Sequence, residues 1–180
     1  MGIQSVEFFP FARTSTNPAL EDFGRGINIL SDTDTYAKAP RGQMCYAFHT
    51  SFNAWGRFRY CHFKKKICQK GAPVAYSGAA KINLAASVAN SQQRAGIAMA
   101  RASASQYAWV QVEGANFQRV PTDGGIAAGD VCIKDESTAG MLDTVTRSTA
   151  STQTGWIMAR ALAADSGSFM AIGKLIITCE

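Results

Sequence analysis

The stretch whose residue types most clearly suggest a binding chemistry is WGRFRYCHFKKKICQK at residues 55–70, where cations alternate with aromatic side chains. The cations are Arg57, Arg59, Lys64, Lys65, Lys66 and Lys70, and the aromatic residues are Trp55, Phe58, Tyr60 and Phe63. Cations that contact phosphates beside rings that stack on bases suit a single-stranded nucleic acid. The same alternation also builds an ordinary sheet, whose rings enter the core and whose cations face solvent or an acidic neighbour. We favour the second interpretation, because alternation with period two is typical of a half-buried strand.

Thiols and imidazoles overlap this stretch. They belong to Cys45, His49, Cys61, His62 and Cys68. Thiolate and imidazole are zinc ligands, and two strands that bring them together would form a tetrahedral site. However, neither the Cys45-x3-His49 nor the Cys61-x6-Cys68 spacing is the C-x2-C pair of a zinc knuckle. We therefore expect no metal and no other cofactor, and instead buried free thiols and packed histidines.

Groups for catalysis are sparse as well. No recognisable nucleophile motif surrounds any of the five cysteines, and the acids are scattered apart from the adjacent Asp135 and Glu136. Gly124 and Gly125 are not followed by the Lys-Ser/Thr pair of a phosphate loop. We expect a protein that is not an enzyme and that acts through its surface.

The elements that must position these residues are predicted to be short strands. From residue 44 onward, Val, Ile and aromatic runs are separated by Gly, Asn, Asp and Ser every eight to twelve residues or so, as in β-sandwiches and barrels. MCYAFHT at 44–50 and RFRYCHF at 57–63 are expected to form a hairpin. Its second strand would place Phe58, Tyr60 and His62 on one face and Arg57, Arg59, Cys61 and Phe63 on the other.

The predicted fold is therefore all-β: a small β-barrel or β-sandwich domain of short antiparallel strands with an extended N-terminal arm. Residues 1–40 mix aromatic residues and prolines without a steady period, so we expect either an arm that packs on a partner or an N-terminal strand of the same domain. Phe8, Phe9 and Phe11 are its candidate partner contacts. Residues 41–180 form the expected β domain, with a basic strand-hairpin part at 41–92 and a repeat-containing barrel part at 93–180.

Charge is strongly segregated along the chain. The net charge is +5, but residues 35–112 hold eleven Lys and Arg and no Asp or Glu, and the flanking segments each sum to −3. Such asymmetry suggests an acidic partner surface, a nucleic acid, or neighbouring copies of the chain. No stretch approaches the 18 or so apolar residues of a spanning helix, and the first ten residues are unlike a secretion signal, so we expect no membrane partner and synthesis in a cytoplasm.

One motif occurs twice, as GIAMARA at residues 96–102 and GWIMARA at residues 155–161. A strand over the first copy, starting near Arg94, would line one face with Gly96, Ala98, Ala100 and Ala102. A face of Gly and Ala lets another sheet approach closely. We expect the two copies to be matching strands of one small barrel.

The order of elements after residue 93 is a Gly-initiated small-residue strand, the YAWVQVEG strand, an AAGDV turn, a hairpin at DESTAG and the second Gly-initiated strand. This order resembles the small β-barrel decoration, or cement, proteins of tailed-bacteriophage heads. The resemblance covers residues 93–180, half of the chain, and rests on pattern rather than on a catalytic motif.

The resemblance implies a non-enzymatic virion protein that binds the outer surface of the capsid, bridges major capsid subunits and stabilises the shell. Such proteins are commonly homotrimers or homodimers, and we favour the trimer here. The expected partner contacts are the three arm phenylalanines together with Arg57, Arg59, Lys64, Lys65 and Lys66. Two alternatives stay open: a head or tail fibre component, and a single-stranded nucleic-acid-binding module that uses residues 57–70.

Overall fold

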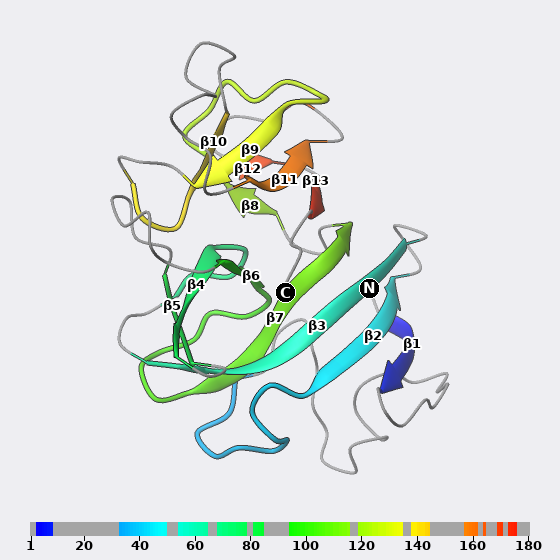
Figure 1. The fold of residues 1–180 in the computed structure, drawn as a ribbon, viewed down its shortest axis with the longest axis vertical. Helices are drawn as coiled ribbons and strands as arrows, with labels where there is room; N and C mark the ends of the chain where they lie inside the picture. The colour runs from blue at the N-terminus through cyan, green and yellow to red at the C-terminus, as the bar shows by residue number, and fades with distance from the viewer. Residues whose placement is uncertain are drawn as a thin grey trace.

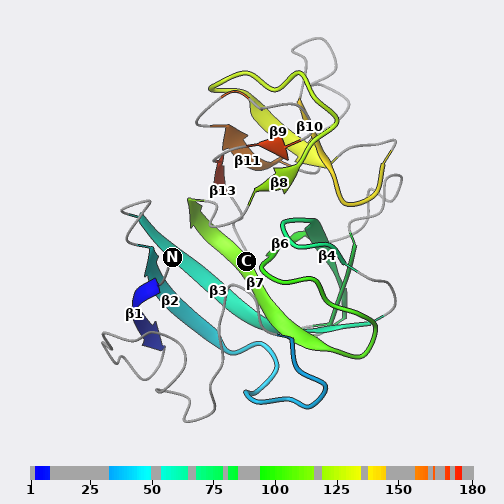
Figure 2. The ribbon, with the colours of Figure 1, turned by 180° about the vertical axis from the view of Figure 1, so that it is seen from behind.

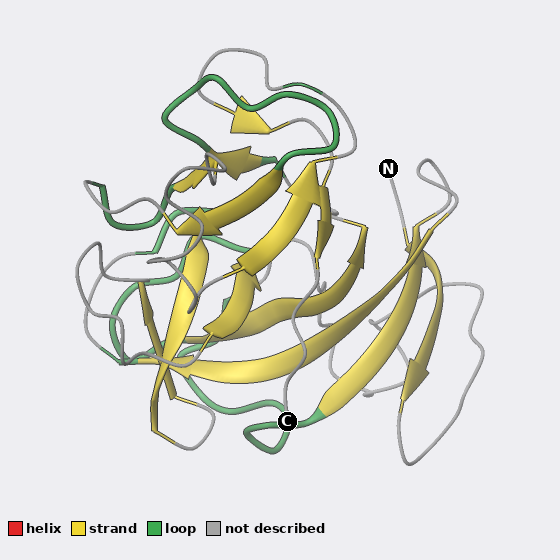
Figure 3. Ribbon diagram, turned by 45° about the horizontal axis from the view of Figure 1, so that its top comes forward, coloured by secondary structure: helices red, strands yellow, loops and turns green. Residues whose placement is uncertain are grey.

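The computed structural model describes residues 3–8, 33–49, 54–64, 68–78, 81–84, 94–115, 119–134, 138–144, 157–161, 164, 169–170 and 173–175. Every regular element in these ranges is a β-strand, which confirms the all-β prediction. Figure 3 shows the same in its colouring, with yellow strands joined by green loops. A helix long and apolar enough to cross a membrane does not occur within the described ranges.

The described residues form thirteen strands in chain order. They are β1 (Ile3–Phe8), β2 (Met44–His49), β3 (Ala54–Phe63), β4 (Pro73–Gly78), β5 (Lys81–Leu84), β6 (Arg94–Ala98), β7 (Tyr107–Ala115), β8 (Val120–Pro121), β9 (Val131–Lys134), β10 (Leu142–Thr144), β11 (Ile157–Ala161), β12 (Phe169–Met170) and β13 (Gly173–Leu175). Eleven of them share one sheet in the order β1-β2-β3-β5-β4-β6-β7-β13-β11-β9-β10, and β8 pairs with β12.

The two longest strands, β3 and β7, run antiparallel along the middle of the molecule (Figure 1). On its other edge, each of these two strands pairs with one strand along its first part and with a different strand along its last part. The first half of β3 pairs with β2 in the predicted hairpin, and its last residues, His62 and Phe63, pair with β5. In the same way β7 pairs with β6 through Val110 and Gln111 and with β13 through Gly114 and Ala115.

These changes of partner close a first barrel. Its ring is β3-β5-β4-β6-β7, and it closes because β7 also pairs with β3. Within this ring, all of the pairings are antiparallel except that of β3 with β5, so the prediction of antiparallel strands holds here with one parallel exception. The interior contains Cys61, Phe63, Val74 and Val110, together with alanines of β6, β7 and the loops.

A second barrel repeats this arrangement with β8 to β13. β9 pairs with β10 and with β11, and β11 pairs with β13. In the first barrel, β4 pairs with β5 and with β6, and β6 pairs with β7, so β9, β10, β11 and β13 correspond to β4, β5, β6 and β7. The parallel bridge between Thr122 and Leu142 corresponds to the parallel pairing of Phe63 with Ile82. β8 pairs with β12 in a separate two-stranded sheet, which the bridge at Thr122 joins to β10. Figures 1 and 2 show the two barrels as separate groups of strands, β3 to β7 below and β8 to β13 above.

The correspondence extends to single hydrogen bonds. In the first barrel the Gly71 N–H donates to the Ala98 carbonyl at 2.8 Å, and the Ala98 N–H donates to the Ala72 carbonyl at 2.9 Å. In the second barrel Gly129 donates to Ala161 at 2.8 Å, and Ala161 donates to Asp130 at 2.9 Å. Gly71 and Gly129 both have positive φ, 85° and 89°, which is the left-handed conformation that glycine adopts without steric cost.

Equivalent positions of the two barrels point into equivalent cores. Cys68 corresponds to Ile126, Val74 to Cys132, and Ala98 to Ala161, and all six side chains are buried. The second core also takes in Ala75 and Ile97, which come from the outer side of the first barrel. The two barrels therefore share apolar packing, and we expect them to unfold together.

This alignment corrects our interpretation of the repeated motif. The first strand does begin at Arg94, as predicted, but it ends at Ala98, so the MARA residues of the first copy follow the strand, whereas IMARA of the second copy is itself β11. The pairing makes Ala161 equivalent to Ala98, although the sequence repeat aligns it with Ala102. The two copies lie in different barrels, since Ala100 and Ala102 belong to the first core and Ala159 and Ala161 to the second.

The N-terminal region contributes to this sheet in two places. β1 is an extended edge strand that pairs with β2, with Phe8 opposite Cys45. Residues 33–40 cover the outer face of β3 and β7: Asp34 exchanges two backbone hydrogen bonds with Tyr107, at 2.9 and 2.8 Å, and Asp34 and Ala39 are buried. Residues 9–32, which include Phe9 and Phe11, lie outside the described ranges.

Candidate functional site

The alternation predicted for β3 is present. Tyr60 lies opposite Trp109 and His62 opposite Tyr107, whereas Arg59 lies opposite Val110 and Cys61 opposite Ala108. Because paired residues of an antiparallel ladder share a face, the rings and the arginines project from opposite sides of the strand.

The aromatic side chains of the basic stretch are mostly buried. Phe58 and Tyr60 have no exposed area and Phe63 has almost none. The Tyr60 ring lies 5.1 Å from the Trp109 ring and is stacked 5.8 Å from the Tyr107 ring, measured between centroids. Our preferred interpretation of these three rings as core residues is confirmed, and none of them is accessible for stacking on a base.

Asp34 fastens residues 33–40 onto this aromatic layer. The Tyr60 hydroxyl donates to Asp34 Oδ2 at 2.9 Å and accepts from the Lys38 backbone N–H at 3.3 Å. Lys38 Nζ lies 2.6 Å from Asp34 Oδ1. Burial, and further the hydrogen bond and negative charge of Asp34, raise the pKa of Tyr60 well above its ordinary value.

The four thiols in the described part of the chain are buried as expected. Cys45, Cys61, Cys68 and Cys132 are free and buried. Burial raises the pKa of the Cys68 thiol to about 12 and the pKa of the Cys45 thiol well above its ordinary value. A thiol that holds its proton is a poor nucleophile and a poor metal ligand.

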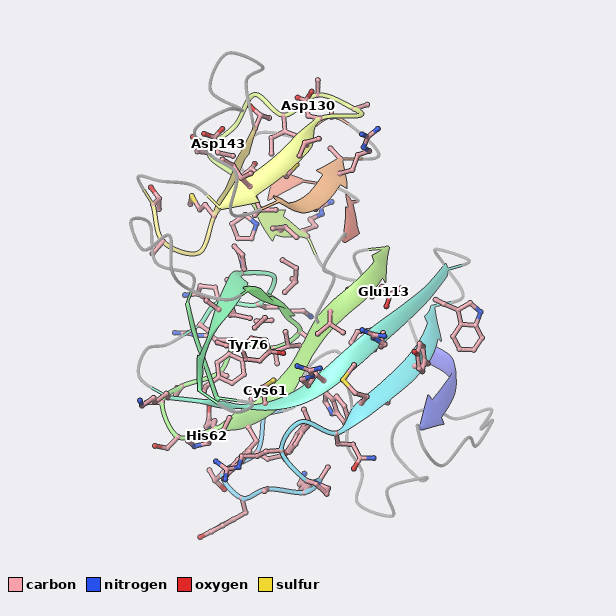
Figure 4. The ribbon with its side chains drawn as sticks, in the orientation of Figure 1. Cys61, His62, Tyr76, Glu113, Asp130 and Asp143 are labelled. Atoms are coloured by element: carbon pink, nitrogen blue, oxygen red, sulfur yellow. The ribbon has the colours of Figure 1, made fainter. Side chains whose placement is uncertain are left out.

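The predicted cluster of possible metal ligands is divided by the sheet. Cys61 and Cys68 enter the core of the first barrel, whereas Cys45 pairs with Phe58 on the opposite face. Figure 4 shows Cys61 and His62 projecting to different sides of β3. No group of three potential metal ligands occurs among the described side chains, which do not include that of His49.

Arg57 and Arg59 lie on the face of β3 that carries Cys61, but on the part of the strand that pairs with β2 beyond the barrel. They share this face with the residues that pair with them or contact them. We call the set Met44, Tyr46, Trp55, Arg57, Arg59, Tyr76 and Glu113 the arginine face.

Arg59 is held in place by neutral groups. Its Nε donates to the Met44 Sδ at 3.1 Å, and its Nη1 donates to the Tyr76 hydroxyl. The guanidinium carbon lies 5.6 Å from the centre of the Tyr76 ring, within the range of a cation–π contact. Met44 and Tyr76 in turn pack against the core of the first barrel, so the guanidinium rests on a rigid support.

Arg57 has a carboxylate partner. Its Nε lies 3.3 Å from Glu113 Oε2 on β7, and the Glu113 side chain is 55% exposed whereas that of Arg57 is 26% exposed. Trp55, two residues before Arg57, is 46% exposed. The arginine face thus presents one large ring, two arginines and one carboxylate to solvent.

The remaining candidate residues are placed as follows. Lys64 follows β3 and is exposed, and Lys70 is exposed in the turn before β4. Lys65 and Lys66 lie outside the described ranges, as do Phe9 and Phe11, and only the backbone of Phe8 is described. The structure therefore brings Arg57 and Arg59 together. It adds Tyr76, which comes from another strand, and Glu113, and neither was identified from the sequence.

The chemistry that this surface offers is recognition rather than bond making. An arginine with neutral neighbours, an arginine–glutamate pair and an exposed tryptophan can bind a protein surface through charge-assisted hydrogen bonds and apolar contact. Trp55 had a sequence signal, since it shares period-two spacing with Arg57 and Arg59. Tyr76 had no such signal in the sequence, because β4 comes close to β3 only when the strands close into the first barrel.

Comparison with protein-family models finds no match for this chain, and comparison with curated proteins finds no match either.

Proposed function

We propose that this protein is a non-enzymatic structural protein of a bacteriophage virion, a decoration or cement protein that binds the outer surface of the head. It is made in the host cytoplasm, bridges major capsid subunits and acts as a homo-oligomer, with a trimer favoured over a dimer. The family resemblance of residues 93–180 suggests this role.

The observation that carries the proposal is how the side chains of the first barrel are distributed. Its thiols and most of its rings are buried, whereas Lys64, Lys70 and Arg101 are exposed. Residues 54–115 contain nine Lys and Arg against a single Glu. A barrel with a closed core and a cationic exterior favours action by docking on an acidic surface.

The proposal assigns two kinds of contact to the protein. Phe8, Phe9 and Phe11 would anchor the N-terminal segment by burying apolar area on the capsid. Arg57, Arg59 and Lys64 to Lys66 would orient the first barrel on acidic capsid loops.

The experiment is co-sedimentation of the protein with nuclease-treated, DNA-free heads that were assembled without it. We expect saturable binding that stabilises the heads against heat, and a loss of binding of tenfold or more when Phe8, Phe9 and Phe11 are all replaced by Ser. A wild-type protein that stays in the supernatant at every concentration would contradict the proposed function.

A further inference from the structure

The arginine face has the composition of a protein-binding surface. Trp, Tyr, Arg and Met are enriched where proteins bind one another, and truncation of Trp, Tyr or Arg there has the largest effects. Here these residue types occupy one side of β2, β3 and β4. They lie outside the core of the first barrel but are supported by it.

Arg59 is the unusual member of this face. A guanidinium has five N–H donors, and two groups of the Arg59 side chain, Nε and Nη1, donate to a thioether and a hydroxyl. Among the residues whose side chains are described, no carboxylate lies within ion-pair distance of Arg59. A half-buried, pre-oriented guanidinium with neutral neighbours is suited to accept a carboxylate from outside.

Glu113 indicates what kind of partner fits. Its exposed carboxylate, 3.3 Å from Arg57, would repel a phosphate backbone laid across the face. Trp55 is the one large ring of β3 that is well exposed, and the other large rings of this strand, Phe58, Tyr60 and Phe63, are buried. The charges and exposures therefore favour a protein partner that presents a single acidic side chain next to apolar ones.

We propose that the arginine face is the close-contact surface of the first barrel, with Arg59 receiving an Asp or Glu side chain of the major capsid protein and Trp55 packing beside it. This inference rests on the proposed function and adds a division of labour. Arg59 and Trp55 hold the complex together, whereas exposed cations outside the face, such as Arg101, only steer its formation.

Association and dissociation rates separate these roles, because steering acts on association and buried contacts act on dissociation. The measurement is biolayer interferometry on immobilised DNA-free heads assembled without this protein. The variants are Arg59→Gln, Arg59→Lys and Trp55→Ser. The matched controls are Arg101→Gln, an exposed arginine of the first barrel, and Tyr36→Ser, an aromatic residue that is 84% exposed in the segment covering the opposite side of β3.

We expect Arg59→Gln and Trp55→Ser to raise the dissociation rate tenfold or more, with Arg59→Lys in between. Arg101→Gln should slow association a fewfold at low salt, and Tyr36→Ser should change neither rate. The thermal unfolding midpoint of each variant checks that it is folded, and Trp55→Ser keeps the test decisive if Arg59→Gln unfolds, since Trp55 is largely at the surface.

Three results would overturn the proposal. Wild-type dissociation rates in both Arg59→Gln and Trp55→Ser would show that the face is not the contact while leaving the proposed function intact. A wild-type protein that does not bind heads would remove the proposed function and this inference together. Binding of single-stranded DNA that is lost in Arg59→Gln, without head binding, would assign the face to nucleic acid.

Discussion

The two barrels share the pairings of four successive strands, β4 to β7 in the first and β9, β10, β11 and β13 in the second, but their exteriors differ. Residues 54–115 hold nine Lys and Arg against one Glu, whereas residues 119–175 hold five against six Asp and Glu. Figure 4 marks Asp130 and Asp143 on the second barrel, and Glu113 on β7 of the first. Backbone hydrogen bonds and turn glycines are shared, and charge is not. Strand pairing thus specifies the common scaffold, whereas the charged surface residues make the two barrels suited to different partners.

The cores differ as well. The first barrel is filled by Phe63 and is backed on its outer face by a layer that includes Tyr60 and Trp109. The described core of the second contains no aromatic side chain and is completed by Ala75 and Ile97 of the first. The second barrel is therefore expected to depend on the first for its apolar packing.

The largest expected effect comes from the equivalent turn glycines. An alanine Cβ at Gly71 would lie 1.9 Å from the Arg119 carbonyl oxygen, whereas at Gly129 no atom lies within 4 Å. Gly71→Ala should lower the free energy of unfolding by more than about 4 kcal/mol, because backbone must move, and Gly129→Ala by about 1 kcal/mol, the cost of the left-handed conformation. Urea unfolding of both variants measures this, and equal losses would contradict the packing difference between the barrels.

The shared core gives the next effect. Ile97→Ala should lower the free energy of unfolding by about 2–5 kcal/mol, since it leaves a cavity in the second core although Ile97 belongs to β6. Leu142→Ala, on β10, should act to a similar extent on the same single transition. Two separate transitions, followed by tryptophan fluorescence and circular dichroism, would show that the barrels unfold independently.

Alkaline pH should destabilise the protein through three buried groups, Cys45, Cys68 and Tyr60. The folded-state pKa values of Cys45, Cys68 and Tyr60 are all raised, so the folded chain keeps protons that the unfolded chain releases. Stability from these groups is complete below about pH 8.5 and falls as pH rises further, by up to about 1.4 kcal/mol per unit and group. Urea unfolding between pH 8 and 11 measures the slope.

Tyr60→Phe provides the comparison for this slope. The variant should lose stability less steeply than the wild type above about pH 10, where an unfolded tyrosine ionises. A Tyr36→Phe variant, which changes an exposed ring, serves as the control. An unchanged slope in Tyr60→Phe would exclude this tyrosine as a source of alkaline instability.

The smallest effect should come from the exposed cations. Lys64→Gln and Arg101→Gln lie on the surface and should change the free energy of unfolding by less than about 0.5 kcal/mol. A larger loss would mean that the cationic exterior of the first barrel stabilises its fold, rather than serving a partner.

Several local features followed from the sequence because they depend on neighbouring residues. The β2–β3 hairpin, the alternation along β3, the start of β6 at Arg94 and the turn at 127–130 were all predicted. The position of Asp34 was not, since its burial depends on Tyr60 and Tyr107, which are distant in the sequence.

The sequence by itself determined that this chain is all-β, that the rings of Phe58, Tyr60 and Phe63 and the described thiols are buried, and that its middle is cationic, because period-two hydrophobicity, turn residues and charge are local properties. Only the tertiary structure decided that there are two matching barrels, that the repeated MARA residues are offset between them, and that Tyr76 and Glu113 join Arg57 and Arg59. Those outcomes depend on which strands pair, and the free energy of pairing comes from residues far apart in the chain.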